Sequence, residues 1–99
     1  METAYLISLE EFCASHDIEI SFINSLKESG LIEITTIDEA VFIEADRLQQ
    51  LEKFVRLYYE LDINLEGIET INYLLQRISS MQAEITTLRN KLRIYETEY

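Results

Sequence analysis

The stretch "LDINLEGIETINYLLQRI", residues 61–78, decides the fold of this chain because it predicts where one helix ends and the next begins. Asn64 is a favourable N-cap residue, since its side chain can accept a hydrogen bond from the first helical turn. Ile63 and Ile68 have the spacing of a hydrophobic staple across that cap. Gly67 falls in the first turn, where it costs less helix stability than in a helix interior. We therefore predict a helix boundary at Asn64.

The chain after this boundary carries an apolar heptad repeat. Positions a are Ile71, Ile78, Ile85, Leu92 and Tyr99, and positions d are Leu74, Met81, Leu88 and Tyr95. Apolar residues at all of these positions predict a coiled coil. A helix over residues 65–97 would be about 50 Å long, which is more than the rest of this short chain could cover. We therefore expect a second copy of the chain to pair with the distal seam, through Ile78, Met81, Ile85, Leu88, Leu92 and Tyr95.

The charged residues beside the heptad repeat fit pairing in both orientations. In a parallel pair Glu84 would meet Arg89, whereas in an antiparallel pair Glu84 would meet Lys91. The sequence therefore predicts a homodimer without choosing the direction of its helices.

The residues before the boundary predict a helix over residues 44–61, with Asp46 near its start to suit the helix dipole. Its apolar face is wide, as expected for a helix packed on a core. That face comprises Leu48, Leu51, Val55, Tyr58 and Leu61, with Phe54 and Leu57 beside them.

Two short helices are expected near the N-terminus. In "ISLEEF", residues 7–12, Ser8 and Glu11 have the spacing of a capping box, and the helix should run to about His16. Its apolar face is Leu9, Phe12 and Cys13. The next helix lies within "DIEISFINSLKESGLI", residues 17–32, and ends at Gly30. Its apolar stripe is Ile20, Ile23 and Leu26, with Phe22 as a further candidate.

A β-hairpin is expected between these helices and the helix over residues 44–61. "LIEITTI", residues 31–37, alternates apolar and polar residues, with Ile32, Ile34 and Ile37 on one side. The polar "DEA" and the apolar "VFI" follow. Two short helices joined by a tight turn and followed by a hairpin predict a winged helix-turn-helix.

Length and composition predict one small, mainly helical domain. The chain has 99 residues, 47% of them apolar, with two glycines and no proline. The N-terminus does not have the basic segment followed by an apolar run that is typical of an export signal. No apolar run in the sequence is long enough to span a membrane. The lone Cys13 cannot form an internal disulfide. We therefore expect a cytoplasmic protein that does not enter the membrane.

The net charge of −11 is distributed unevenly along the chain. Residues 1–50 contain 11 acidic residues against 2 basic ones, a net of −9, whereas residues 51–99 contain 8 against 6, a net of −2. The first half should therefore attract a basic partner and repel a phosphate backbone.

The order of these elements resembles the MerR-type winged-helix family. "FINSLKESGLI" lies where that family has its recognition helix, and residues 62–68 lie where it has the turn between its last two helices. The resemblance implies a mainly α fold with a small β-hairpin wing and a long C-terminal dimerisation helix. Residues 1–61 would form the winged helix-turn-helix-like domain, and residues 62–99 the turn and pairing helix, within one continuous structural unit.

The chain is still more similar to the chaperone-modulator CbpM family, a MerR-like group of about this length. "EEFCASHDIEISFINSLKESGLIE" resembles its N-terminal segment, and "VRLYYELDINLEGIETINYLLQRI" with "LRNKLR" resembles its C-terminal half. Members bind the J-domain of a DnaJ-type co-chaperone such as CbpA and restrain its work with a DnaK-type chaperone. The resemblance therefore implies a J-domain partner with a basic surface. One departure is Asp17, where both groups tend to have glycine; aspartate tolerates the left-handed backbone that such a turn needs.

Acidic residues beside aromatic side chains are the candidate contacts for a basic partner. We expect them on the helix over residues 44–61 and in the turn and first residues that follow it. The candidate partner-binding residues are Glu52, Tyr59, Glu60, Asp62, Glu66 and Glu69.

Other functions have less support in the residues. A DNA reader needs basic residues on its recognition helix and wing, whereas this chain has Lys27 alone on that helix and Asn24 at the position where the family has arginine. Cys13 and His16 do not have metal-ligand spacing, and no nucleophile or phosphate-loop motif occurs. We therefore expect no enzyme activity, metal or cofactor. The alternatives are a MerR-type transcriptional regulator that binds DNA and a coiled-coil adaptor between proteins.

Overall fold

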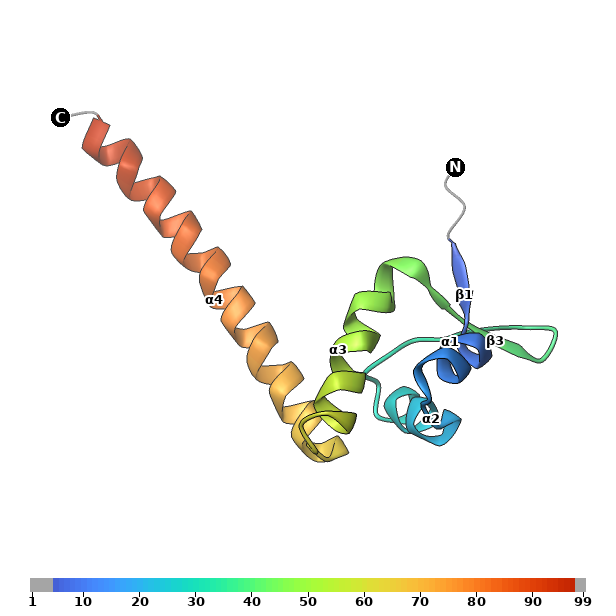
Figure 1. Ribbon diagram of the computed structural model, residues 1–99. Coiled ribbons are helices and arrows are strands. Elements are labelled where there is room, and N and C mark those ends of the chain that lie inside the picture. The colour runs from blue at the N-terminus through green and yellow to red at the C-terminus, as the bar shows by residue number, and fades with distance from the viewer. Residues whose placement is uncertain (1–4, 98–99) are drawn as a thin grey trace. The chain divides into compact units, whose positions relative to one another are not determined.

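The computed structural model describes residues 5–97, which form a mainly helical chain with a three-stranded antiparallel sheet (Figure 1). The chain divides into two compact units, Met1–Glu69 and Thr70–Tyr99. The first unit contains the sheet and helices α1, α2 and α3, together with the first residues of α4. The winged helix-turn-helix architecture expected from the sequence is confirmed.

The N-terminal helix α1 (Leu9–His16) begins and ends as its residues predict. Ser8 is the N-cap, and its Oγ accepts a hydrogen bond from the Glu11 N–H at 3.3 Å. Asp17 takes the left-handed conformation with φ 56°, so aspartate does occupy the turn in place of glycine. The Ile18 N–H then donates to the Cys13 carbonyl oxygen at 2.9 Å, which closes the end of the helix.

Helix α2 (Ile20–Glu28) ends in a Schellman motif at Gly30. Gly30 has φ 81°, a conformation that glycine adopts without steric cost. The Leu31 N–H donates to the Leu26 carbonyl oxygen at 2.9 Å, and the Gly30 N–H donates to Lys27 at 3.0 Å. Phe22 is buried on this helix, whereas Ile20 is exposed. The prediction that Ile20 belongs to the core stripe was wrong, because the first residue of the helix lies at the rim.

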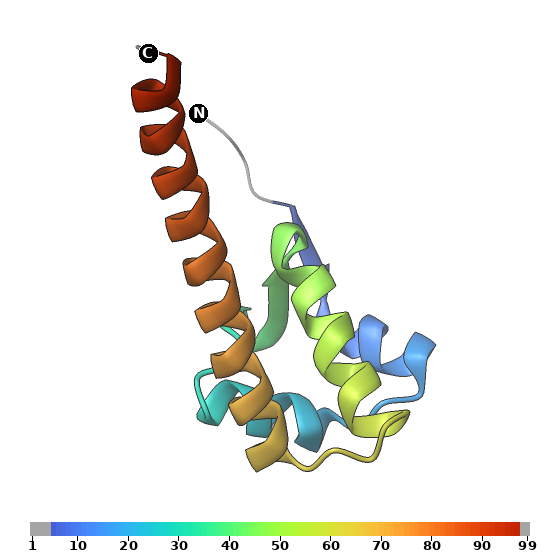
Figure 2. The same ribbon diagram turned by 90° about the vertical axis from the view of Figure 1, so that its left-hand side faces the viewer.

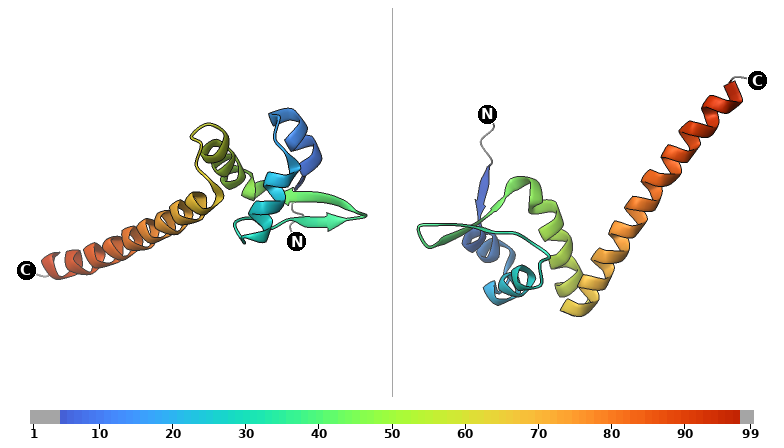
Figure 3. Two further views of the ribbon diagram at one scale, coloured as in Figure 1. Left: turned by 90° about the horizontal axis from the view of Figure 1, so that it is seen from below. Right: turned by 180° about the vertical axis from the view of Figure 1, so that it is seen from behind.

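The expected hairpin consists of β2 (Thr35–Ile37) and β3 (Ala40–Glu44). Asp38 and Glu39 connect them with φ of 50° and 70°, the positive values of a two-residue type I′ turn. The left view of Figure 3 shows this turn projecting beyond the helices of the same unit, as a wing does. Ile37 is exposed on the wing, so only Ile32 and Ile34 of the predicted apolar side reach the core.

A third strand, which the sequence did not predict, completes the sheet. Residues Leu6–Ser8 form β1 and pair antiparallel with β3, so that Ile7 lies opposite Ile43 and the strand order is β1-β3-β2. Three residues are too few to show a strand periodicity. The pairing exists only because β3 lies beside them in the folded chain.

The core of the first unit is formed by residues of β1, β3, α1, α2 and α3, of the loops between them and of the start of α4, and these elements lie together in Figures 1 and 2. Strand β2 is exposed and contributes no core residue. No polar or charged side chain is buried among the described residues. The fully buried side chains are Leu9, Ile23, Leu26, Ile43, Leu51, Phe54 and Ile68. Because Ile68 belongs to this core, the first unit extends into the start of α4.

Helix α3 (Leu48–Tyr59) is shorter than the predicted helix at both ends. Residues Ala45–Arg47 form a 3-10 turn before it, and the helix stops at Tyr59. The chain then turns at Asp62, whose φ is 55°. Leu61 therefore lies in the turn and is 63% exposed, so its predicted place on the apolar face was wrong.

The boundary at Asn64 is confirmed. The Asn64 Oδ1 accepts a hydrogen bond from the Gly67 N–H at 2.8 Å, and α4 (Leu65–Thr97) begins directly after it. The structure gives a steric reason for glycine at position 67, beyond the low cost of glycine in the first helical turn. A Cβ at this position would lie 2.7 Å from Ile63 Cγ2 and 3.0 Å from Asn64 Oδ1, so the staple residue and the cap close over the bare backbone.

The described residues of the second unit all belong to α4, an uninterrupted helix of 33 residues whose start, Leu65–Glu69, lies in the first unit. Tyr99, the last a position of the heptad repeat, lies outside the described residues. Across residues 5–97, no helix combines the length and the apolar character that a membrane crossing requires.

Candidate functional site

The helix-turn-helix and wing present an acidic surface. The exposed side chains on and beside α2 and the hairpin include Glu19, Asn24, Lys27, Glu28, Glu33, Asp38 and Glu39. Lys27 is the single cation of this set. The nearby Arg47 is paired with Glu33, with 3.5 Å between Arg47 Nη2 and Glu33 Oε1. Five of these seven residues are acidic and one is basic, a balance that opposes binding of a phosphate backbone.

The six predicted partner-binding residues are all exposed, but they lie in three places along the chain. Glu52 and Glu60 line a groove between α1 and α3. Tyr59 and Asp62 lie together at the turn that follows α3. Glu66 and Glu69 belong to the first residues of α4. The structure therefore brings together two pairs from the predicted set rather than one continuous acidic face.

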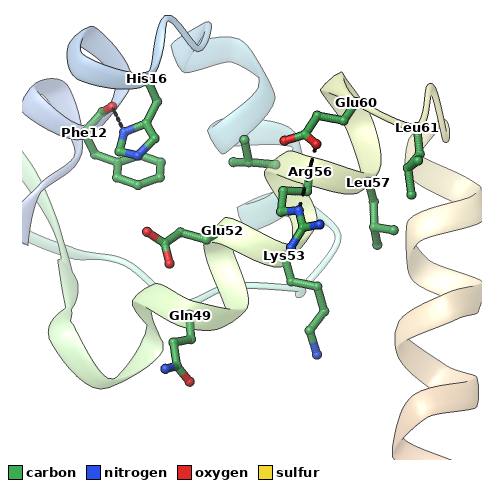
Figure 4. Close-up of a pocket in the computed structure, with 10 residues that line it drawn as sticks. Phe12, His16, Gln49, Glu52, Lys53, Arg56, Leu57, Glu60 and Leu61 are labelled. Carbon is green, nitrogen blue, oxygen red and sulfur yellow. Dashed lines mark hydrogen bonds and ion pairs between the residues drawn. The ribbon is translucent and has the colours of Figure 1, made fainter.

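The groove between α1 and α3 has a volume of about 530 Å³ and carries charges of both signs. Figure 4 shows Phe12 and His16 at one side and α3 at the other, with Lys53 and Arg56 beside Glu52 and Glu60. Arg56 Nε lies 4.0 Å from Glu60 Oε1, an exposed pair that contributes little stability. The two cations reduce the negative potential that the sequence alone suggested for this surface.

His16 has a structural role at the end of α1. Its ring stacks on Phe12 with 4.2 Å between the centroids, and its Nδ1 lies 3.0 Å from the Phe12 carbonyl oxygen. A carbonyl can only accept, so the ring fits there with the proton on Nδ1. Within residues 5–97, no group of three or more His, Cys, Asp or Glu side chains is placed to hold a metal ion.

Cys13 is a core residue, as predicted. It is buried beside the other apolar residues of α1, and burial raises the pKa of its thiol because the thiolate would lose solvation. A raised pKa and a buried position make this thiol unreactive in the folded protein.

Three aromatic side chains form a cluster where α2 meets the end of α3. The Phe22 ring stacks on Tyr58 at 4.3 Å between centroids and meets Tyr59 edge to face at 5.6 Å. The two tyrosines lie 5.0 Å apart, also edge to face. The Tyr59 hydroxyl accepts a hydrogen bond from the Glu19 N–H at 3.2 Å. Phe22 is buried, but both tyrosines remain 39% exposed.

Two shallow hollows adjoin this cluster, and both are lined by Tyr58, Tyr59 and Asn64. One hollow, of about 370 Å³, also contains Asp62. The other, of about 230 Å³, also contains Glu19. Among the described residues, each hollow beside the tyrosine pair is therefore lined by one acidic residue and no basic one, which is a different environment from the mixed charge of the α1–α3 groove.

Sequence reasoning missed Phe22, Tyr58 and Glu19 as parts of a candidate surface. Tyr58 was assigned to the apolar face of its helix, and Glu19 precedes a different helix in the chain. The one local signal was the adjacent tyrosine pair at the end of α3. The contact with α2, across about forty positions of sequence, depends on the tertiary fold.

The seam of α4 is exposed in a single chain. Its six predicted dimerisation residues, Ile78, Met81, Ile85, Leu88, Leu92 and Tyr95, are between 48% and 65% exposed. An apolar row of this length along one helix is unusual on a monomer surface and is typical of an interaction site.

Comparison with known proteins defines the class to which this chain belongs. A family model described as "MerR HTH family regulatory protein" matches residues 7–90. The match covers most of the chain, so the protein belongs to the MerR helix-turn-helix family of regulatory proteins. No curated protein and no solved structure matches the chain.

Proposed function

We propose that this protein is a chaperone modulator that binds the J-domain of a DnaJ- or CbpA-type co-chaperone and restrains its co-chaperone activity. The chain-wide likeness of its motifs to the CbpM family supports the choice of partner. Its place of action would be the cytoplasm, where such a co-chaperone works with a DnaK-type chaperone.

The observation that carries the proposal is the acidic character of the helix-turn-helix and wing. Lys27 stands among six exposed residues that are acidic or neutral, and Glu33 is paired with Arg47. A regulator fold that has lost its phosphate contacts can still present shape and negative charge to a basic protein surface. The J-domain surface that meets a DnaK-type chaperone is basic, so an acidic modulator would compete for it.

Self-association through α4 is part of the proposal. A second copy would cover the exposed seam from Ile78 to Tyr95, because a parallel or antiparallel partner helix can match its heptad spacing. Glu84, Arg89 and Lys91 beside the seam could form ion pairs across such a dimer. The charges again allow both directions.

Titration of the full chain with a purified J-domain tests the proposed function directly. We expect binding that weakens with salt, together with loss of the co-chaperone's stimulation of a DnaK-type ATPase. A J-domain whose basic surface residues are replaced by glutamine is the matched control and should not bind. Absence of binding to the unaltered J-domain would rule out the proposal.

Membership of the MerR family favours a second candidate, a transcriptional regulator that binds DNA. It predicts tight, salt-sensitive binding to a duplex containing a two-fold symmetric site. Selection of bound sequences from a random duplex pool would test it. Enrichment of one sequence would favour the regulator despite the acidic surface, whereas no enrichment would leave the J-domain proposal as the better explanation.

A further inference from the structure

We infer that the tyrosine pair at the end of α3 forms a receptor for one arginine or lysine side chain of a protein partner. The receptor consists of Tyr58 and Tyr59, together with Asp62, which lines one of the two hollows beside them, and Glu19, which lines the other. The inference rests on the proposed function, since it names the place where a basic partner would insert its cation.

The aromatic rings provide the first part of the recognition. Tyr58 and Tyr59 line both hollows, and each keeps 39% of its surface exposed although the cluster packs against buried Phe22. Aromatic rings attract cations through their quadrupole, and they also cover the aliphatic stem of lysine or arginine. Exposed tyrosines of this kind are common anchors of protein interfaces.

The carboxylates provide the second part and distinguish this surface from the groove on the other side of α3. Asp62 lies in one hollow and Glu19 in the other, and no lysine or arginine of the described chain lines either of them. The α1–α3 groove, in contrast, contains Lys53 and Arg56. A cation approaching α3 should therefore prefer the tyrosine side, where negative charge is not offset.

The receptor is held in place before any partner arrives. Tyr59 is fixed by its hydrogen bond from the Glu19 N–H and by its contacts with Phe22 and Tyr58. Asp62 is held in the turn at φ 55°, where the Ile63 N–H donates to the Leu57 carbonyl oxygen at 2.9 Å. Groups that are already ordered lose little entropy on binding, which favours recognition of a single side chain.

Two charge-removing variants test the receptor on the full chain. Asp62→Asn keeps the left-handed turn, because asparagine tolerates positive φ, and Glu19→Gln leaves α2 intact, because the Glu19 side chain makes no capping hydrogen bond. The double variant should weaken J-domain binding about tenfold. The matched control, Glu10→Gln with Asp46→Asn, removes the same charge from exposed positions that line neither hollow and should change binding less than about twofold. Equal weakening by both pairs would overturn the inference while leaving the proposed function in place.

A peptide titration tests the receptor without the J-domain. The probe is a short arginine-containing peptide, and its control is the same peptide with citrulline, which has the same shape without the charge. In ¹⁵N NMR spectra the arginine peptide should shift the amides of Tyr58, Tyr59 and Asp62, and the citrulline peptide should not. The shifts should shrink in Tyr59→Leu. Shifts centred on Lys53 and Arg56, or equal shifts with both peptides, would overturn the inference. Binding of the peptide without binding of the J-domain would support the receptor and reject the proposed function.

Discussion

The two units of this chain differ in the burial of their apolar side chains and in their net charge. The first unit, Met1–Glu69, buries Leu9, Phe54 and Ile68 in its own core. The second unit, Thr70–Tyr99, is helical over its described residues, and the apolar seam of this helix stays about half exposed. In sequence terms the first unit has 16 acidic and 4 basic residues, a net of −12, whereas the second has 3 and 4, a net of +1.

This difference suits the two tasks that we propose for this short chain, which are partner recognition and self-association. The first unit completes its core and carries all of the excess negative charge, which suits recognition of a basic partner. The second unit is nearly neutral, so two copies of its helix would not repel each other strongly. A uniform distribution of the charge would place like charges along the seam and oppose pairing.

The largest expected effect comes from charging the seam. Ile85→Glu with Leu88→Glu should abolish self-association, a loss of about 5 kcal/mol or more for the proposed dimer, because the new carboxylates would be buried against each other. Light scattering measures the change in mass. Ala83→Glu with Asn90→Glu adds the same charge on the opposite side of the helix and should keep the assembly. A monomeric parent protein would contradict pairing through α4.

A core truncation should affect the first unit alone. Phe54→Ala is expected to lower the free energy of unfolding of that unit by about 3–5 kcal/mol, because it removes a large side chain that is 1% exposed. Urea denaturation followed by circular dichroism measures the loss. Ile20→Ala, on an exposed side chain, should cost less than about 1 kcal/mol. A similar cost for both variants would show that the first unit does not depend on this core.

Gly67 tests the comparison at the start of α4, beside Ile68, the last core residue of the first unit. Gly67→Ala should destabilise the first unit by about 1–2 kcal/mol, although alanine is the better helix former, since its Cβ would meet Ile63 Cγ2. In an Ile63→Ala background most of that clash disappears, and the same change should become neutral or favourable. A stabilising Gly67→Ala in the parent chain would show that the staple does not need the glycine.

The smallest effect concerns Cys13, a reporter that exists only in the first unit. Burial raises the pKa of its thiol, so the folded state favours the neutral form, and that contribution to stability is complete below the pKa of the unfolded chain. It should decline above about pH 8.5 and be lost as pH rises through the raised pKa. The stability difference between the parent and Cys13→Ala should therefore shrink at alkaline pH. A constant difference in urea titrations would contradict the raised pKa.

Much of the fold could be predicted because local chemistry places its boundaries. The cap at Ser8, the left-handed residues at Asp17 and Gly30, and the cap at Asn64 each act within a few residues, and all four are confirmed. The predictions were wrong where a structure or an exposure depends on more than the neighbouring residues. Strand β1 needs β3 as its neighbour, and the exposure of Ile20 and Leu61 depends on where their helices begin and end.

The candidate site was less predictable for the same reason. Exposed acids could be chosen from the sequence, but their grouping could not, because Glu52 and Asp62 lie ten positions apart and line different surfaces. The partner contacts themselves and the dimer stay predictions.

The sequence by itself determined the capped helix boundaries at Ser8, Gly30 and Asn64, the heptad seam and the charge of each region, since these depend on residue type and spacing along the chain. Residues 61–78 predict the cap, the staple and the start of the seam from their spacing alone. The tertiary structure alone decided that Glu19, before α2, meets Tyr59 of α3 and that β1 pairs with β3. These contacts join residues from different turns or elements, so they arise only when the core packs.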